Sequence, residues 1–221
     1  MKALLTSSGF TTPGIISACE DLVSKQAREI NAAVINEGYA VEYGDHTWVI
    51  EELSRLRKTF GGIVELINLL VLDIQAVKER ISQADLIYVV GGNTDYLMHV
   101  YSKTGFADML PELLKSKVYV GSSAGSMVIG NRVSTESYQR IYGEGDTFGI
   151  NKYLGFVDLA IKPHLNSSEW PNNRVEKLQE VSSSFSGTLY GLSDTSAITV
   201  NGEKVDVIGE DWVRIEKGKV L

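Results

Sequence analysis

Residues 117–130, KVYVGSSAGSMVIG, contain the transition that decides the fold. A β-rich run leads into a turn of small residues, and a helix is expected to begin in AGSMVIG. Within the turn, Gly121 to Gly125 fits the pattern G-x-S-x-G, in which the central residue lies at a strained strand-to-helix corner. Small neighbours allow the backbone to turn there. This register makes Ser123 a candidate nucleophile, and it aims the following amide, that of Ala124, at the space where a substrate oxygen would lie.

The alternative interpretation, in which the same residues have only a structural role, is a Ser/Gly-rich turn with a serine that caps a helix. G-x-S-x-G is a weak motif by itself, and the strand before it strengthens it. Ser122 precedes the corner and Ser126 lies one helical step beyond it. A serine hydroxyl is a poor nucleophile at neutral pH, so the catalytic interpretation requires a base elsewhere in the chain.

Short apolar strands alternate with amphipathic helices around this motif. Because strands that are apolar throughout must be covered on both faces, the pattern predicts a three-layer α/β fold with a mostly parallel sheet and helices on both sides. The C-terminal segments are shorter, and tight turns join them, so we expect a small antiparallel extension on one edge of the sheet. The sequence shows no linker, and residues 1–221 are expected to form a single domain.

The predicted strands are 2–8, 28–38, 63–70, 84–92, 117–123, 157–163, 188–194, 196–202, 204–209 and 212–219. The predicted helices are 46–62, 74–83, 93–105, 106–116 and 171–180.

The composition narrows the function. A chain of 221 residues with 43% hydrophobic content can bury one substantial core, and its net charge of -7 without a basic stripe argues against nucleic acid or an anionic membrane as a partner. One cysteine, Cys19, permits neither an internal disulfide nor a cysteine-rich metal site. The longest apolar region, residues 63–77, is broken by polar residues, and the N-terminal residues lack a signal-peptide core. We expect a soluble, cytoplasmic protein without metal or organic cofactor.

The chain has three histidines, so the search for a base is short. His164 follows an apolar strand that ends at Pro163, and the carboxyl ends of strands are where α/β folds place their chemistry. His46 lies in a polar loop, where we expect it to be exposed, and His99 lies within a predicted helix. His164 is therefore the candidate base, with a strand-end histidine bonded to a loop carbonyl as the alternative.

A third group should orient the imidazole and stabilise its charged form. Asp194 also terminates an apolar strand, and it is the candidate acid, although it could instead form an Asx-turn. Glu169 is closer to His164 in sequence, but it is expected to begin a loop and helix. The order Ser123, His164, Asp194 differs from the order Ser, acid, His of the α/β-hydrolase fold and argues against that fold. The three side chains are expected to converge at the edge of a single sheet.

A second amide is needed to bind an oxyanion beside that of Ala124. In residues 84–97 an apolar strand runs into Gly91 and Gly92, and Thr94 is expected to cap the helix that follows. The Gly92 amide is the candidate, and Asn93 beside it is a candidate substrate-binding residue. A phosphate-binding turn lacks support because the G-x-G-x-x-G spacing is absent, whereas a plain tight turn remains an alternative.

Four segments in this order, VGGNT, GSSAGS, IKPHLNS and GLSDTSAITV, resemble the peptidase E family of serine peptidases. This family includes aspartyl dipeptidases and cyanophycinases, and its fold is related to the class I glutamine amidotransferases. The resemblance covers nearly the whole chain. It implies that Ser123 is the nucleophile, His164 the base and Asp194 the acid, although the aspartyl dipeptidases carry glutamate at the position of the acid.

The resemblance also implies a substrate. Aspartyl dipeptidases accept an N-terminal aspartate through an arginine after the histidine loop, and Arg174 matches that position, with a loop that looks shorter. Its guanidinium can clamp a carboxylate, although it could also be a surface arginine paired with a nearby acid. We therefore expect a serine peptidase, a monomer or homodimer, that hydrolyses dipeptides with N-terminal Asp. The alternatives are a ligand-binding sensor without catalysis and a glutaminase-like amidase.

Overall fold

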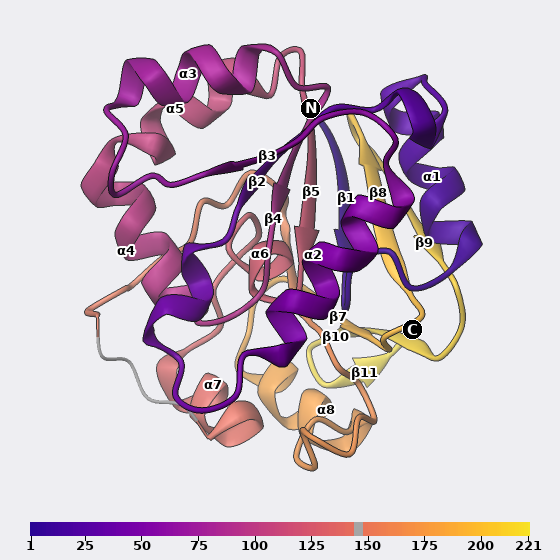
Figure 1. Ribbon diagram of the computed structural model, residues 1–221. Coiled ribbons are helices and arrows are strands. Elements are labelled where there is room, and N and C mark those ends of the chain that lie inside the picture. Colours follow the sequence, from indigo (N-terminus) through magenta and orange to yellow (C-terminus); the bar gives the residue numbers. More distant parts are fainter. Residues whose placement is uncertain (144–147) are drawn as a thin grey trace.

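A seven-stranded sheet, here called the main sheet, forms the centre of the protein (Figure 1). The computed structural model describes residues 1–143 and 148–221. The first five strands in the order below are parallel, and the last two are antiparallel to their neighbours. The order is β3 (Val64–Ile67), β2 (Ala32–Ile35), β4 (Leu86–Val89), β5 (Val118–Ser122), β1 (Lys2–Thr6), β8 (Ala197–Asn201) and β9 (Lys204–Ile208).

Helices cover both faces of the main sheet because successive side chains of each strand point to opposite sides. In β1, Leu4 packs with the helices of one face, whereas Ala3 and Leu5 pack with those of the other. The first face carries α1 (Pro13–Val23) and α2 (Thr47–Thr59), which lie in front of the sheet in Figure 1. The second carries α3 (Ile74–Ser82), α4 (Thr94–Thr104) and α5 (Phe106–Leu113). Two short 3-10 helices, η1 (Ala27–Glu29) and η2 (Glu37–Val41), flank β2.

A second sheet of four strands lies beside the main one. Its order is β11 (Lys219–Val220), β10 (Trp212–Glu216), β7 (Thr188–Leu192) and β6 (Leu159–Lys162). Strands β6 and β7 are parallel, and the other pairs are antiparallel. The remaining helices are α6 (Ala124–Met127), α7 (Thr135–Tyr142) and α8 (Val175–Ser183).

The predicted fold class is confirmed, and β8 and β9 form the predicted antiparallel extension of one edge, but the other C-terminal strands do not take part in it. Only β8 and β9 extend the main sheet, while β7, β10 and β11 join β6 in the second sheet. The packing explains the division. Ile198 of β8 lies in the core against α3 to α5, whereas Leu189 of β7 and Ile215 of β10 lie in a separate core with α8. Helices α1 and α7 are not predicted from the sequence.

Two parallel pairings set the positions of the functional residues. In the main sheet Thr6 of β1 pairs with Ser122 of β5, and in the second sheet Lys162 of β6 pairs with Gly191 of β7. The residues that follow these strands therefore emerge next to one another. Among the described residues no helix is both long enough and apolar enough to cross a lipid bilayer.

Candidate active site

Ser123 lies at the corner between β5 and α6. Its φ of 50° and ψ of -115° are rare for a residue with a side chain, so the surrounding structure must hold it there. Its amide donates to the Thr6 carbonyl at 3.1 Å. Gly125 lets α6 approach β4 so closely that a Cβ at this position would lie 2.2 Å from the carbonyl oxygen of Val89. The strained corner expected from the sequence is present, and it leaves Ser123 half-buried between the fully buried Ser122 and Ser126.

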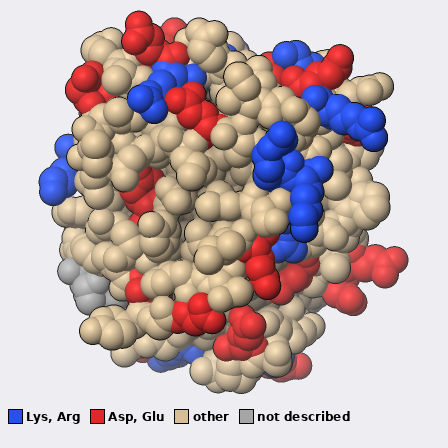
Figure 2. Space-filling model, viewed as in Figure 1, with Lys and Arg blue, Asp and Glu red and all other residues tan. Residues whose placement is uncertain are grey.

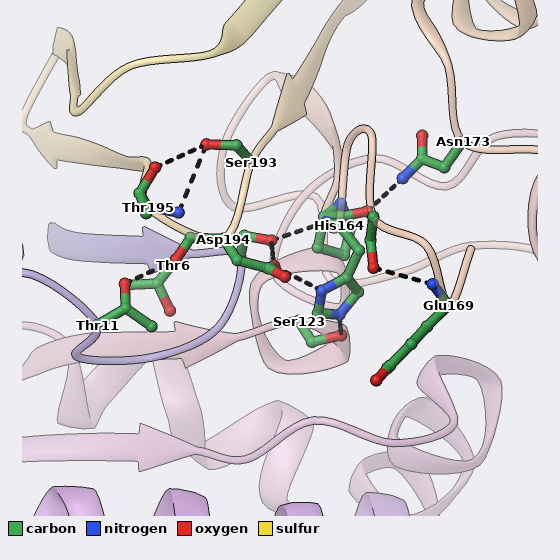
Figure 3. A network of polar contacts seen from close by, with 12 residues as sticks. Thr6, Thr11, Ser123, His164, Glu169, Asn173, Ser193, Asp194 and Thr195 are labelled. Atoms are coloured by element: carbon green, nitrogen blue, oxygen red, sulfur yellow. Dashed lines mark hydrogen bonds and ion pairs between the residues drawn. The ribbon is translucent and has the colours of Figure 1, made fainter. Parts of the chain in front are cut away.

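His164 connects the corner serine to a carboxylate (Figure 3). Its Nε2 lies 2.9 Å from Oγ of Ser123, and its Nδ1 lies 2.7 Å from Oδ1 of Asp194. An ionised carboxylate only accepts hydrogen bonds, so Nδ1 carries the proton and donates to it. The neutral ring then offers the Nε2 lone pair to the serine hydroxyl, which is the arrangement a general base requires.

The expectation that the three side chains converge on a single sheet is wrong. Ser123 follows β5 of the main sheet, whereas His164 and Asp194 follow β6 and β7 of the second sheet. The histidine and the aspartate meet because their strands are parallel neighbours. Burial raises the pKa of the Asp194 carboxyl, but hydrogen bonds from His164 and Ser7 and the positive charges of His164 and Arg55 outweigh it, so this pKa lies below its ordinary value.

Ser7, to which sequence reasoning assigned no role, joins the two sheets. It follows β1, is fully buried, and donates from Oγ to Oδ1 of Asp194 at 2.7 Å. Oγ of Ser7 also accepts a hydrogen bond from the backbone N–H of His164 at 2.7 Å. Thr11 adds a bond from its hydroxyl to the Asp194 carbonyl at 2.6 Å. The available signal was a pair of serines directly after an apolar strand, in the same position as the corner serine after β5.

A cleft with a volume of ≈ 410 Å³ opens over Ser123 and His164. Aromatic side chains form part of its wall. The indole of Trp170 stacks on His164 with centroids 6.3 Å apart, and Trp48 lies beside Gly91. The volume is within the range of small-molecule sites, which is roughly 300–1,000 Å³.

Gly91 and Gly92 line the cleft opposite the histidine loop. Gly92 has a φ of 113°, and a Cβ there would lie 2.3 Å from the carbonyl carbon of Gly38, so only glycine fits. A Cβ at Gly91 would lie 3.1 Å from Cβ of Ser123, which places this turn against the nucleophile candidate. Within the described part of the chain, the amides of Gly92 and Ala124 donate to no other group.

Asn93, rather than Thr94, caps α4. Its side chain accepts from the amide of Tyr96 at 2.9 Å, because its extended backbone directs the carbonyl oxygen onto the helix end. Thr94 is the first residue of the helix and is fully buried, with its hydroxyl 3.3 Å from that of Tyr138. The described residues that line the cleft do not include Asn93.

Arg174, like Asn93, is not among the described residues that line the cleft. It is the N-cap residue of α8, and its guanidinium donates to the carbonyls of Ser167, Trp170 and Asn173 at 3.0–3.1 Å. These three bonds fasten the loop after His164 upon itself. In this arrangement three of the five N–H donors of Arg174 are used within the protein.

Among the described contacts, the hydroxyl of Ser123 bonds to none of the other candidates considered from the sequence. His46 precedes α2 and packs edge-on against Tyr39, and it is half-buried rather than exposed as predicted. His99 stacks with Tyr96 on α4. Glu169 is exposed at the cleft, and its amide donates to Oγ of Ser167 at 3.2 Å.

A buried carboxyl lies beneath the cleft. Glu52 of α2 is 8% exposed and accepts a hydrogen bond from the Tyr88 hydroxyl at 2.7 Å. Burial raises the pKa of Glu52, and the hydrogen bonds and neighbouring positive charges offset this only in part. This pair could not be predicted from the sequence, because a glutamate in an amphipathic helix ordinarily faces solvent.

An α/β fold that brings a corner serine within hydrogen-bond distance of a histidine paired with an aspartate is typical of serine hydrolases. Comparison with protein families makes this specific: the model of peptidase family S51 matches residues 3–208. The chain belongs to peptidase family S51, and it is a serine peptidase.

Individual proteins that are similar to this chain are also named as peptidases. An uncharacterized peptidase of Listeria monocytogenes is 26% identical over 165 residues, which cover 72% of this chain and 77% of the relative. Peptidase E of Shewanella oneidensis is 29% identical over 163 residues, 68% of this chain and 67% of the relative. Among solved structures, a candidate peptidase E from Listeria monocytogenes superposes with a TM-score of 0.75 at 20% identity, covering 95% of this chain and 98% of the other. The last of these establishes the similarity of fold.

Proposed function

We propose that this peptidase hydrolyses short peptides, preferentially dipeptides with N-terminal Asp, through an acyl-enzyme on Ser123. One observation carries the catalytic part: the Ser123 hydroxyl is 2.9 Å from His164, whose second nitrogen is 2.7 Å from Asp194. Among the described residues that line the cleft, no other serine hydroxyl is hydrogen-bonded to an imidazole nitrogen.

The reaction follows from this chain of contacts. His164 takes the proton of Ser123 as the oxygen attacks the scissile carbonyl, and Asp194 supports the positive charge of the ring. The amides of Gly92 and Ala124 donate to the oxyanion of the tetrahedral intermediate. The C–N bond then breaks, and His164 returns the proton to the leaving amine. A water molecule, deprotonated by the same histidine, releases the acid and restores the hydroxyl of Ser123.

The substrate proposal has two supports. The motifs resemble those of aspartyl dipeptidases, and relatives that match this chain carry the name peptidase E. The cleft is also small and partly walled by Trp48 and Trp170, which favours a short peptide over an extended chain.

Replacing the hydroxyl tests the catalytic part. Ser123→Ala should lower kcat for Asp-Leu by on the order of 10⁴–10⁶, because the three side chains act as a unit. Ser168→Ala is the matched control, since Ser168 is exposed at the same cleft, and it should retain wild-type turnover. A Ser123→Ala enzyme that keeps more than about a tenth of wild-type turnover would exclude the mechanism.

A substrate panel tests the preference. The wild-type enzyme should cleave Asp-Leu with a higher kcat/KM than the isosteric Asn-Leu, and it should release little ammonia from glutamine. Equal values for the two dipeptides would contradict the preference for Asp, and rapid ammonia release would identify an amidase instead.

A further inference from the structure

Helix α2 brings one cation into the cleft. Arg55 lines it together with Ser123 and His164, and it is the only lysine or arginine among the described residues that do so. It is half-buried. Its guanidinium makes neither a hydrogen bond nor an ion pair with any residue in the ranges 1–143 and 148–221. Arg174, by contrast, is not among the described residues that line the cleft, and three of its N–H donors bond to carbonyls.

The location of Arg55 is fixed by the helix. It lies three residues after Glu52, so both side chains point from the same face of α2 toward the cleft. The positive charge of Arg55 offsets part of the rise that burial causes in the pKa of Glu52, and it contributes to the lowered pKa of Asp194. Figure 2, which looks onto α2, shows basic side chains over its C-terminal half and acidic ones lower on the same face.

The surrounding charges make this arginine selective. The other ionisable side chains of the cleft are mainly carboxylates, among them Glu42, Glu51 and Glu169. Carboxylates repel an anionic ligand, so an acidic group can be bound favourably only where a cation faces it. A guanidinium presents its donors in a planar fork that matches a carboxylate, and here that fork is not used by the protein.

We propose that Arg55 binds a carboxylate of the substrate peptide and thereby determines its selection. The inference rests on the proposed peptidase function, and it assigns to Arg55 the role that the sequence pattern gave to Arg174. The carboxylate is either the side chain of an N-terminal Asp or the C-terminal carboxylate of a dipeptide. Both offer the same chemistry to the guanidinium, and the substrates below separate them.

The first experiment compares kcat/KM for Asp-Leu, Asn-Leu and Asp-Leu amide. Arg55→Gln should lower the value for Asp-Leu by about 10- to 100-fold, the loss expected for hydrogen bonds to a charged group. If the side chain is bound, the preference for Asp-Leu over Asn-Leu should vanish. If the C-terminal carboxylate is bound, the preference for Asp-Leu over its amide should vanish. Arg55→Lys, which keeps the charge but not the fork, should lose less.

Arg174→Gln is the comparison variant, and it should preserve both preferences. If both survive in Arg55→Gln, or if Arg174→Gln abolishes one, the inference is overturned. Unfolding by urea should show that Arg55→Gln is folded, as expected for a guanidinium that makes no hydrogen bond or ion pair with the described residues.

A binding measurement separates this inference from the proposed function. Calorimetry with Ser123→Ala gives the Kd of Asp-Leu without turnover, and adding Arg55→Gln should weaken it by about 10-fold or more. Such weakening, with a wild-type enzyme that cleaves no peptide, would defeat the proposed function and leave the Arg55 site intact. Cleavage of Asp-Leu with a Kd independent of Arg55, or no measurable binding, would overturn the site.

Discussion

The two sheets supply different parts of one active site, and they hold them by different means. The main sheet supplies Ser123 on a corner enclosed by buried residues, where packing against β4 fixes the backbone. The second sheet supplies His164 and Asp194 on half-exposed segments, where hydrogen bonds fix the side chains. The nucleophile therefore depends on the core, whereas the base depends on a few polar contacts that single substitutions can remove.

Asp194→Asn disrupts the His164–Asp194 pair of the second sheet, and we expect it to have the largest effect on kcat of the three substitutions below. An amide at this position can donate to Nδ1 and so stabilise the wrong tautomer of His164, which should lower kcat by on the order of 10⁴. Steady-state kinetics with Asp-Leu measures the loss, and urea unfolding checks that the fold survives. A loss below about tenfold would mean that this carboxylate does not support the histidine.

Ser7→Ala should weaken the connection between the sheets. It removes the hydrogen bond that Ser7 donates to Asp194 and the one that it accepts from the amide of His164, both at 2.7 Å. We expect kcat to fall by about 10- to 100-fold with little change in KM, since hydrogen bonds to charged groups contribute about 1.5–3 kcal/mol. The adjacent Ser8→Ala serves as control and should behave as wild type. Equal effects of the two substitutions would argue against a positioning role for Ser7.

Glu52→Gln should have the smallest effect, on stability rather than turnover. Because the pKa of Glu52 is raised in the folded protein, folding favours the protonated form, and stability is lost as the pH rises through that pKa. Glutamine does not titrate, so the variant should lose less stability than wild type between about pH 5 and about pH 8 in urea unfolding. Glu37 and Glu42, whose pKa values are also raised, should preserve part of the pH dependence of stability in the variant. Identical slopes for variant and wild type would show that Glu52 is ionised throughout.

The parts of the site that depend on local sequence could be predicted. The G-x-S-x-G corner, the glycine turn after β4 and the histidine after Pro163 each follow from residue types within a few positions. The parallel main sheet is also readable, because its strands are apolar on both faces.

What depends on packing between distant segments could not be predicted. Tight turns identified the C-terminal strands, but which core each strand joins is decided by side chains such as Ile198 and Leu189. Likewise, the position of Arg174 in the motif does not reveal the three carbonyls that accept hydrogen bonds from its guanidinium. Arg55 lies in an ordinary amphipathic helix, and only the fold places it at the cleft.

Covalent labelling with a fluorophosphonate tests most directly whether His164, which follows the second sheet, activates the hydroxyl of Ser123, which follows the main sheet. Peptide mass mapping should locate one adduct per chain on Ser123, and His164→Asn should slow its formation by orders of magnitude. An adduct on Ser122 or Ser126, or a labelling rate that does not change in His164→Asn, would contradict the account.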